Sequence, residues 1–236
     1  MNHEKLSRRL ERVAIHIPKE STLADIGSDH AYLPCYAVLK GLIAKAIAGE
    51  VAEGPFRSAR EQVEQMELQH AIDVRKGDGL EVLSPNEATC IAVAGMGGTL
   101  ISSILERGKD RLAGVKRLIL QPNVGASNIR IWLLENDWEL IDEEILEEDE
   151  QIYEILIAEK GDPLRPYSEN RDLEIILGPF LKKEQNKAFA KKWSQEKAHW
   201  ERIVKQLEEK GQNPDLNAKR SELLMQIRMV EEALNQ

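Results

Sequence analysis

Apolar residues follow two alternating patterns through the first 160 residues of the chain. Short apolar runs predict five strands, centred near Leu23, Ala46, Ile72, Ile91 and Leu118. Apolar residues at helical spacing between these runs predict helices at 32–39, 55–66, 99–106 and 126–135. A further amphipathic helix precedes the first strand, with Leu6, Leu10, Val13 and Ile17 on one side. Strands that alternate with helices predict an α/β fold built on a doubly wound, mostly parallel sheet.

Two further strand-like segments follow this region, at Trp138–Leu146 and Gln151–Lys160. Only the four acidic residues 147–150 join them, whereas a parallel crossover needs about a dozen residues. The pair is therefore predicted to form an antiparallel hairpin. A hairpin in this place resembles the class I methyltransferase fold. It fits poorly with a nicotinamide dehydrogenase, whose glycine spacing the first strand-end loop also lacks.

The composition changes near residue 164, where the turn residues Gly161-Asp162-Pro163 precede a lysine-rich segment of helical pattern. We therefore predict two domains, 1–163 and 164–236. In the second, Trp193, Trp200 and Leu207 recur every seven residues, and the polar stretch 210–215 separates them from a second apolar series. This pattern predicts a coiled-coil-like, antiparallel helical hairpin. Its tryptophans are predicted to pack in the seam rather than to stack on nucleobases.

The composition of the chain indicates where the protein is located and which kinds of ligand it does not bind. The 236 residues are 42% hydrophobic, without an apolar run of membrane-spanning length or the apolar segment of a secretion signal. This predicts a cytoplasmic protein with a buried core and no membrane partner. The net charge of −9 divides into about −11 for residues 1–163 and about +2 for residues 164–236. Cys35 and Cys90 stand far apart, which predicts two buried thiols, no disulfide and no metal site.

Glycines and carboxylates gather where the predicted strands end. Asp25 and Gly27 follow the first strand, and the pattern recurs at Gly49-Glu50, Gly77-Asp78-Gly79 and Ala94-Gly95-Met96-Gly97-Gly98. The carboxyl ends of parallel strands share one edge of the sheet, where open α/β sheets bind ligands. The sequence therefore predicts a small-molecule cofactor site at that edge.

Five motifs in order resemble the bacterial tRNA (adenine-22-N1) methyltransferase family across essentially the whole chain. They are Asp25–Pro34, Gly49-Glu50, Gly77-Asp78-Gly79-Leu80, Ala94–Gly98 and Leu120-Gln121-Pro122-Asn123. The resemblance implies a Rossmann-like, seven-stranded class I fold that uses S-adenosyl-L-methionine. It also implies methylation of N1 of adenine 22 in the D-arm of bacterial tRNA.

The resemblance and the local chemistry together indicate a set of cofactor contacts. Glu50 is expected to accept hydrogen bonds from the ribose hydroxyls, and Asp78 from the adenine amine, although Asp78 also fits a simple Asp-Gly turn. His30 is equally a helix cap or core residue, and Tyr32 is equally a packing residue. The complete set is Asp25, Gly27, Ser28, Asp29, His30, Tyr32, Glu50, Asp78, Gly79, Ala94, Gly95, Met96 and Gly97.

The fourth motif differs from that of many base methyltransferases, and the difference bears on which atom of the base is methylated. Residues 94–98 take the place of the Asn-Pro-Pro-Tyr-type loop that grips an exocyclic amine in many base methyltransferases. Its absence favours attack by a ring nitrogen, which needs no prior deprotonation. Asp29 is a candidate for orienting the base or for taking the later proton, with cofactor binding alone as the alternative. Asn123 is a candidate for reading the adenine edge, and it is equally a turn residue.

Two groups of basic residues are candidate contacts for tRNA phosphates, and solvated helix faces are the alternative. They are Lys182, Lys183, Lys187, Lys191 and Lys192, and Lys5, Arg8, Arg9 and Arg12. A monomer is favoured, although the helical seam fits closure within one chain or between two. Two other functions remain open. The chain is either a class I methyltransferase for another RNA base or a small molecule, or a non-catalytic RNA-binding sensor of S-adenosylmethionine.

Overall fold

The computed structural model describes residues 5–209 and 214–234 and divides into two compact units. The first ends at Pro166, and the second begins at Tyr167. Within the described ranges, no helix is both long enough and apolar enough to cross a membrane.

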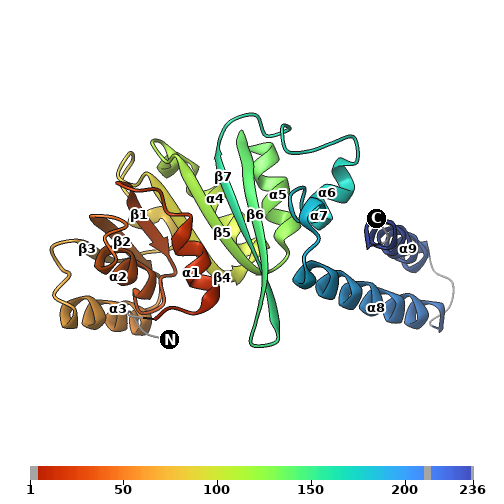
Figure 1. Ribbon diagram of the computed structural model, residues 1–236, viewed down its shortest axis with the longest axis horizontal. Helices are drawn as coiled ribbons and strands as arrows, with labels where there is room; N and C mark the ends of the chain where they lie inside the picture. The colour runs from red at the N-terminus through yellow and green to blue at the C-terminus, as the bar shows by residue number, and fades with distance from the viewer. Residues whose placement is uncertain (1–4, 210–213, 235–236) are drawn as a thin grey trace. The chain divides into compact units, whose positions relative to one another are not determined.

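The first unit is built on a seven-stranded sheet in the order β3-β2-β1-β4-β5-β7-β6 (Figure 1). Strands β1 to β5 pair in parallel, and β7 pairs antiparallel with both β5 and β6. This confirms the predicted class I methyltransferase topology. The strands are β1 Thr22–Ile26, β2 Lys45–Glu50, β3 Ile72–Lys76, β4 Cys90–Gly97, β5 Arg117–Val124, β6 Trp138–Glu148 and β7 Gln151–Lys160.

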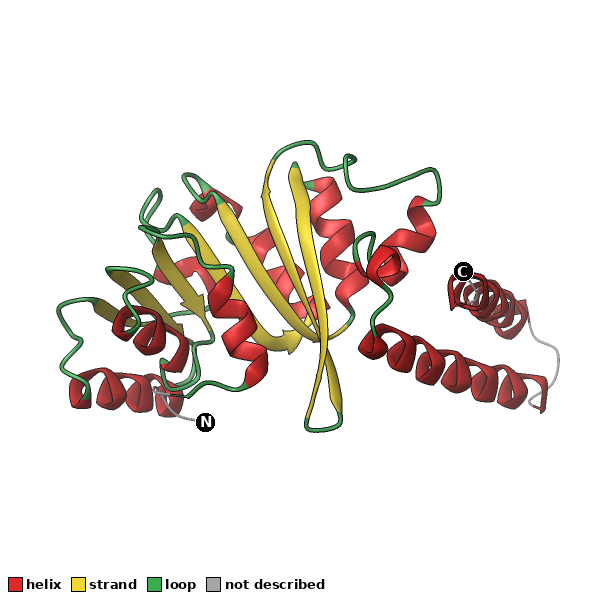
Figure 2. Ribbon diagram, in the orientation of Figure 1, coloured by secondary structure: helices red, strands yellow, loops and turns green. Residues whose placement is uncertain are grey.

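The terminal hairpin is longer than its apolar pattern indicated. Strand β6 continues through Glu147 and Glu148, so the turn is reduced to Asp149 and Glu150, both at positive φ. Figure 2 shows the hairpin extending past the neighbouring strands at its turn end. The acidic residues fit a strand here because Glu148 binds the helix that precedes β1.

Helices cover both faces of this sheet, with α1 to α3 on one face and α4 and α5 on the other (Figure 1). Cys35 and Cys90 are buried in the apolar core between helices and sheet. Helix α1 starts after Ser7, whose hydroxyl accepts a hydrogen bond from the Leu10 N–H. The elements are α1 Arg8–Ile15, α2 Tyr32–Leu39, α3 Glu53–Gln65, α4 Gly98–Arg107, α5 Ala126–Glu135 and the 3-10 turns η1 Gly79–Val82 and η2 Lys109–Leu112.

A buried ionic cluster ties α5 to the hairpin. The side chain of Arg130 is fully buried and bonds Glu143 Oε1 on β6 through Nε at 2.7 Å. Its Nη2 donates to Glu154 Oε2 on β7 at 2.8 Å. Burial alone would lower the pKa of Arg130, but the two carboxylates outweigh it and raise that pKa. The guanidinium is therefore charged and joins three elements of the unit.

The second unit contains two short helices and a helical hairpin. Ion pairs join Lys197 to Glu231 at 2.6 Å and Glu208 to Arg220 at 2.9 Å, so residue numbers rise on one helix as they fall on the other. This confirms the antiparallel arrangement, and Trp200 packs in the seam as predicted. The connection at 210–213 lies outside the described residues. The helices are α6 Arg171–Leu177, α7 Leu181–Glu184, α8 Lys187–Glu209 and α9 Pro214–Leu234.

The predicted lysine ridge is not continuous. Helix α7 ends at Glu184 and α8 begins at Lys187, because Gln185 between them adopts a left-handed conformation with φ 47°. Lys182 is mostly buried and faces Glu174 at 3.5 Å. The exposed lysines are Lys183 on α7 and Lys187 and Lys191 on α8.

Candidate functional site

The ends of β1, β2, β4 and β5 meet at one edge of the sheet. Ile26 pairs with both Gly49 and Val93, and Ala94 pairs with Gln121. The motifs that follow these strands therefore lie side by side, although they are 20 to 100 residues apart in sequence. This is the edge at which parallel α/β sheets bind ligands.

A tight turn leaves β1 at Gly27. Its φ is 70°, and the N–H groups of Gly27 and Ser28 donate to the Gly49 carbonyl at 2.9 and 3.3 Å. A Cβ added at Gly27 would lie 2.2 Å from Cε of Met96, which comes from β4. Glycine is therefore favoured by its backbone conformation, and any larger residue would also require the Met96 side chain to move. The contact also brings the first and fourth motifs together.

Three consecutive residues after this turn, Asp29, His30 and Ala31, have φ values of 42°, 66° and 54°. Asp29 fits this position because aspartate tolerates the left-handed region better than most residues. The His30 ring stacks on Tyr32, with ring centroids 5.3 Å apart. Ala31 rather than His30 occupies the N-cap position of α2, and it makes no side-chain cap. The helix-cap alternative for His30 is therefore wrong.

Two buried carboxylates lie at this edge. Asp25 and Glu50 are 4% and 5% exposed, and the exposed Asp29 lies in the loop that follows β1. Ser28 Oγ donates to Asp25 Oδ2 at 2.5 Å, and the Asp29 N–H donates to Glu50 Oε1 at 2.5 Å. Within the described ranges, no lysine or arginine forms an ion pair with Asp25, Asp29 or Glu50.

This acidic group shifts the pKa values of its members. Burial raises the pKa of Asp25 to about 7 against the lowering effect of the Ser28 hydroxyl, and the charges of Glu50 and Asp29 raise it further. Burial also raises the pKa of Glu50, although the Asp29 N–H opposes that rise. Asp29 Oδ1 lies 3.7 Å from His30 Nε2, and carboxylates that lack a lysine or arginine partner favour a cationic ligand. In the part of the chain that the structure describes, no three histidine, cysteine or acidic side chains are arranged to hold a metal ion.

The fourth and fifth strands supply a hydrogen-bonded loop. Gly95, at φ 78°, is held on both sides of its backbone. Its N–H donates to Gln121 Oε1 at 3.0 Å, and its carbonyl accepts from Asn123 Nδ2 at 2.8 Å. Asn123 is exposed, and its amide nitrogen is used to hold the loop. Gln121 is fully buried, and its importance was not evident from sequence because its partner lies on another strand.

The predicted adenine contact, Asp78, forms an ion pair in this structure. Its carboxylate accepts from Arg107 on α4 at 2.7 and 3.3 Å, and both side chains are about half exposed. The next residue, Gly79, has φ 57° and begins η1, so the segment is also the Asp-Gly turn of the alternative reading. No sequence pattern linked Asp78 with Arg107, because they lie 29 residues apart.

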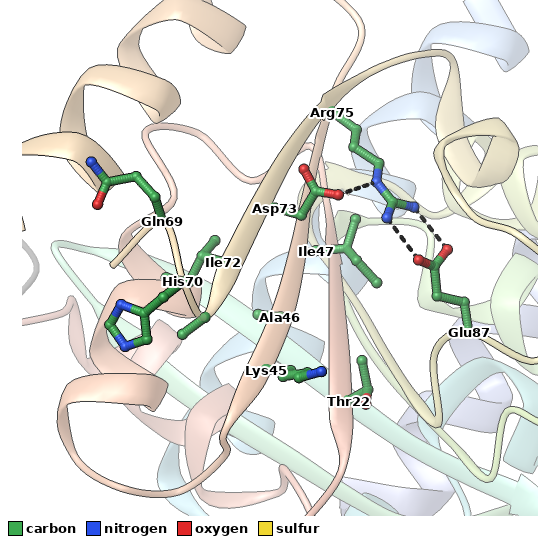
Figure 3. Close-up of a pocket in the computed structure, with 11 residues that line it drawn as sticks. Thr22, Lys45, Ala46, Ile47, Gln69, His70, Ile72, Asp73, Arg75 and Glu87 are labelled. Atoms are coloured by element: carbon green, nitrogen blue, oxygen red, sulfur yellow. Dashed lines mark hydrogen bonds and ion pairs between the residues drawn. The ribbon is translucent and has the colours of Figure 1, made fainter. Parts of the chain in front are cut away.

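A separate pocket of about 360 Å³ lies toward the amino ends of β1, β2 and β3, lined by residues such as Thr22, Lys45 and Ile72 (Figure 3). Arg75 in this pocket is paired with Glu87 through two hydrogen bonds of 2.7 Å and with Asp73 at 2.8 Å. The arginine holds the pKa of Glu87 at about 2. Its charge is therefore compensated, and none of the predicted site residues lines this pocket.

Comparisons with known proteins agree with this geometry. Residues 23–232 match the family model described as tRNA (adenine(22)-N(1))-methyltransferase. A tRNA (adenine(22)-N(1))-methyltransferase of Bacillus subtilis is 50% identical over 236 residues, which cover all of this chain and 99% of the relative.

Two solved structures show how far the similarity extends. The B. subtilis m1A22 tRNA methyltransferase TrmK superposes with a TM-score of 0.95 at 49% identity, over 98% of this chain and 99% of that one. Streptococcus pneumoniae Sp1610 in complex with S-adenosyl-L-methionine gives a TM-score of 0.86 at 39% identity, over 98% and 100% of the two chains. With a family match over most of its length and a close full-length relative, this chain belongs to the tRNA (adenine(22)-N(1))-methyltransferase family.

Proposed function

We propose that this protein transfers the methyl group of S-adenosylmethionine to N1 of adenine 22 in bacterial tRNA. The observation that carries the proposal is the set of carboxylates, Asp25, Asp29 and Glu50, that have no lysine or arginine partner within the described residues and lie at the carboxyl edge of a class I sheet. S-adenosylmethionine is a cationic ligand, because its sulfonium and ammonium charges exceed its one carboxylate. The family and its relatives supply the substrate.

The residues at the edge fit this cofactor. Glu50 ends β2 with one carboxylate oxygen on the Asp29 N–H, and we assign the carboxylate to the ribose hydroxyls. Asp25, Ser28, Asp29 and His30 are assigned to the amino-acid part, with Gly27 allowing close approach of the backbone. Tyr32 supports His30 from below by stacking. The remaining assigned contacts are Asp78 and Gly79 on the adenine side and Ala94, Gly95, Met96 and Gly97 along the fourth strand end.

The sulfonium of the bound cofactor supplies an electrophilic methyl group. The protein's task is to place the N1 lone pair in line with that methyl, and such positioning is worth several orders of magnitude in rate. We assign this positioning role to the loop around Gly95, which hydrogen bonds from Gln121 and Asn123 hold in place. We assign the side-chain carbonyl oxygen of Asn123 to the adenine edge, and the exposed carboxylate of Asp29 to orienting the base or taking the proton lost after transfer.

A direct assay tests this function. Purified protein is incubated with methyl-labelled S-adenosylmethionine and unmodified tRNA, and with the same tRNA carrying guanine at position 22. We expect 1-methyladenosine in digests of the first RNA and no methylated nucleoside in the second, because guanine N1 bears a proton and lacks the free lone pair. Label in another nucleoside would indicate a methyltransferase of different specificity. Cofactor and tRNA binding without any label would indicate a sensor.

The tRNA contacts and cellular setting are part of the same proposal. Lys183, Lys187 and Lys191 are exposed in the helical unit, and Arg8 is exposed on α1. Basic side chains of this kind bind phosphates and would offset the acidic charge of the first unit. N1 of adenine takes part in pairing, so the base must be exposed before reaction. We place the protein in the cytoplasm as a monomer, with the helical seam closed within one chain.

Cofactor affinity is expected to fall as the pH falls below 7. Asp25, with its pKa raised to about 7, becomes protonated and neutral in the empty site, and a cationic ligand prefers the ionised form. The affinity for the cofactor is therefore expected to fall as the pH falls, and the fall approaches tenfold per pH unit well below the pKa of Asp25. Isothermal titration between pH 5.5 and 7.5, below the titration of the ligand's own amine, measures this. A flat profile, or the same slope in Asp25→Asn, would contradict the assignment.

A further inference from the structure

Helix α1 is fixed to the terminal hairpin at its amino end. Glu148 on β6 accepts hydrogen bonds from the N–H groups of Arg8 at 2.5 Å and Arg9 at 3.1 Å. One turn further along, Glu144 on the same strand binds Arg12 at 2.5 Å and His16 at 2.6 Å. These contacts set the position of the helix along the hairpin. They leave the side chain of Arg9 directed to the carboxyl edge of the sheet.

The Arg9 guanidinium makes two contacts there. It lies 5.1 Å from the centroid of the Tyr153 ring, a cation–π distance. Its Nη1 donates to Oε1 of the fully buried Gln121. The same Gln121 oxygen accepts the Gly95 N–H, while its amide nitrogen donates to the Pro122 carbonyl at 2.9 Å. Arg9 therefore fixes which side of the Gln121 amide faces Gly95.

The residues that Arg9 and Gln121 contact are connected to the predicted cofactor site. Gly95 is adjacent to Met96, whose methyl group lies against Gly27 in the first loop. A Cβ placed on Gly95 would come within 3.8 Å of Arg9 Nη1, so the guanidinium itself borders the Gly95 turn. A charged donor to Gln121 makes a stronger hydrogen bond than a neutral one, and the surroundings of Gln121 exclude water.

We propose that Arg9 is a positioning residue for methyl transfer. Through Gln121 it holds the Gly95 turn, and with it Met96, in the conformation that places the adenine against the methyl group. This inference rests on the proposed function and adds a residue to it. It differs from the expectation that Arg9 only contributes charge toward tRNA phosphates, because here the side chain acts inward on the protein.

The two roles predict different kinetic constants. For Arg9→Met, inward positioning predicts a fall in kcat of about 10- to 100-fold, because small displacements of reacting groups are costly. The KM for tRNA should change less than about twofold. If Arg9 instead contacts a phosphate, Arg9→Met should raise the KM for tRNA and leave kcat intact. The slope of tRNA affinity against salt concentration, on logarithmic axes, should then fall by about one.

Matched variants sharpen the comparison. Arg8→Met removes the same charge from the same helical turn, but the Arg8 side chain is exposed, so any effect should appear in KM and salt dependence. Arg9→Lys keeps the positive charge but lacks the planar guanidinium group. Its kcat should lie between those of Arg9→Met and the parent protein. The double variant Arg9→Met/Gln121→Met should be no slower than Gln121→Met alone, because the arginine acts through the glutamine. Full recovery by lysine, or additive losses, would overturn the proposal.

A readout without turnover separates this inference from the proposed function. In ¹⁵N-labelled full-length protein, the Gly95 amide resonance reports the Gly95–Gln121 hydrogen bond. We expect Arg9→Met to shift that resonance and speed its hydrogen exchange, while Arg8→Met leaves both as in the parent protein. An unchanged Gly95 amide in a folded Arg9→Met protein would overturn the positioning role whatever the activity. Failure of the parent protein to methylate tRNA would count against the function alone.

Discussion

Replacing Glu50 by glutamine should weaken S-adenosylmethionine binding about 100-fold while the protein stays folded. Glutamine keeps an oxygen for the Asp29 N–H, which Glu50 binds at 2.5 Å, but its amide nitrogen cannot accept from a ribose hydroxyl. Losing a charged acceptor and leaving a hydroxyl unpaired costs about 2–3 kcal/mol. Isothermal titration measures the affinity, and the melting temperature without cofactor reports the fold.

The fold should not suffer, because burial raises the pKa of Glu50 and its ionised form is unfavourable in the empty site. Glu61→Gln is the control, since it makes the same change on the exposed side of α3. Unchanged affinity in Glu50→Gln would remove Glu50 from the cofactor site. A melting temperature lowered in step with binding would assign it a structural role instead.

Replacing Arg130 by methionine should lower the free energy of unfolding of the first unit by about 3–5 kcal/mol. The substitution leaves Glu143 and Glu154 buried at 3% exposure without the guanidinium that joins them. The chain divides into two units that both contain tryptophan, so fluorescence alone does not assign the loss of stability to the first unit. Hydrogen exchange of β7 amides in increasing denaturant measures it directly.

The triple variant Arg130→Met/Glu143→Gln/Glu154→Gln is the comparison. Neutral amides should recover much of the lost stability, because the main cost is the unpaired buried charge rather than the missing contact. A loss below about 1 kcal/mol in Arg130→Met would show that water or rearrangement satisfies the carboxylates. Equal loss in both variants would indicate that packing, not charge, sets the stability of the cluster.

The sequence predicted the elements whose signals are local. The five parallel strands follow from apolar runs, and the terminal hairpin follows from the short connection after β6. Parallel pairing then places Asp25, Gly27 and Glu50 at one edge without further information. Because residues near strand ends need only the topology to come together, the cofactor side of the candidate site could be proposed before the structure.

Contacts between distant segments could not be predicted in this way. Arg9 and Gln121 lie 112 residues apart, and their contact depends on how α1 is fixed to the hairpin. The pairing of Asp78 with Arg107 similarly requires the position of α4. The prediction of one continuous lysine ridge was wrong for a local reason. The spacing of apolar residues does not reveal that Gln185 adopts a left-handed conformation and ends α7. The roles of the site residues and the functions of the two domains stay predictions.

The left-handed run at Asp29, His30 and Ala31 restricts which substitutions this enzyme can accept. Each non-glycine residue in that region carries a backbone cost of about 1–2 kcal/mol, and a β-branched residue carries more. Valine, isoleucine and threonine are therefore disfavoured at all three positions on backbone grounds alone. Glycine relieves the cost but removes the Asp29 carboxylate and the His30 ring, which we assign to the cofactor, and the Ala31 methyl group, which is buried in the core. We therefore expect the loop to accept only a few small or polar residues at these positions, for reasons of backbone geometry that are independent of the tRNA substrate.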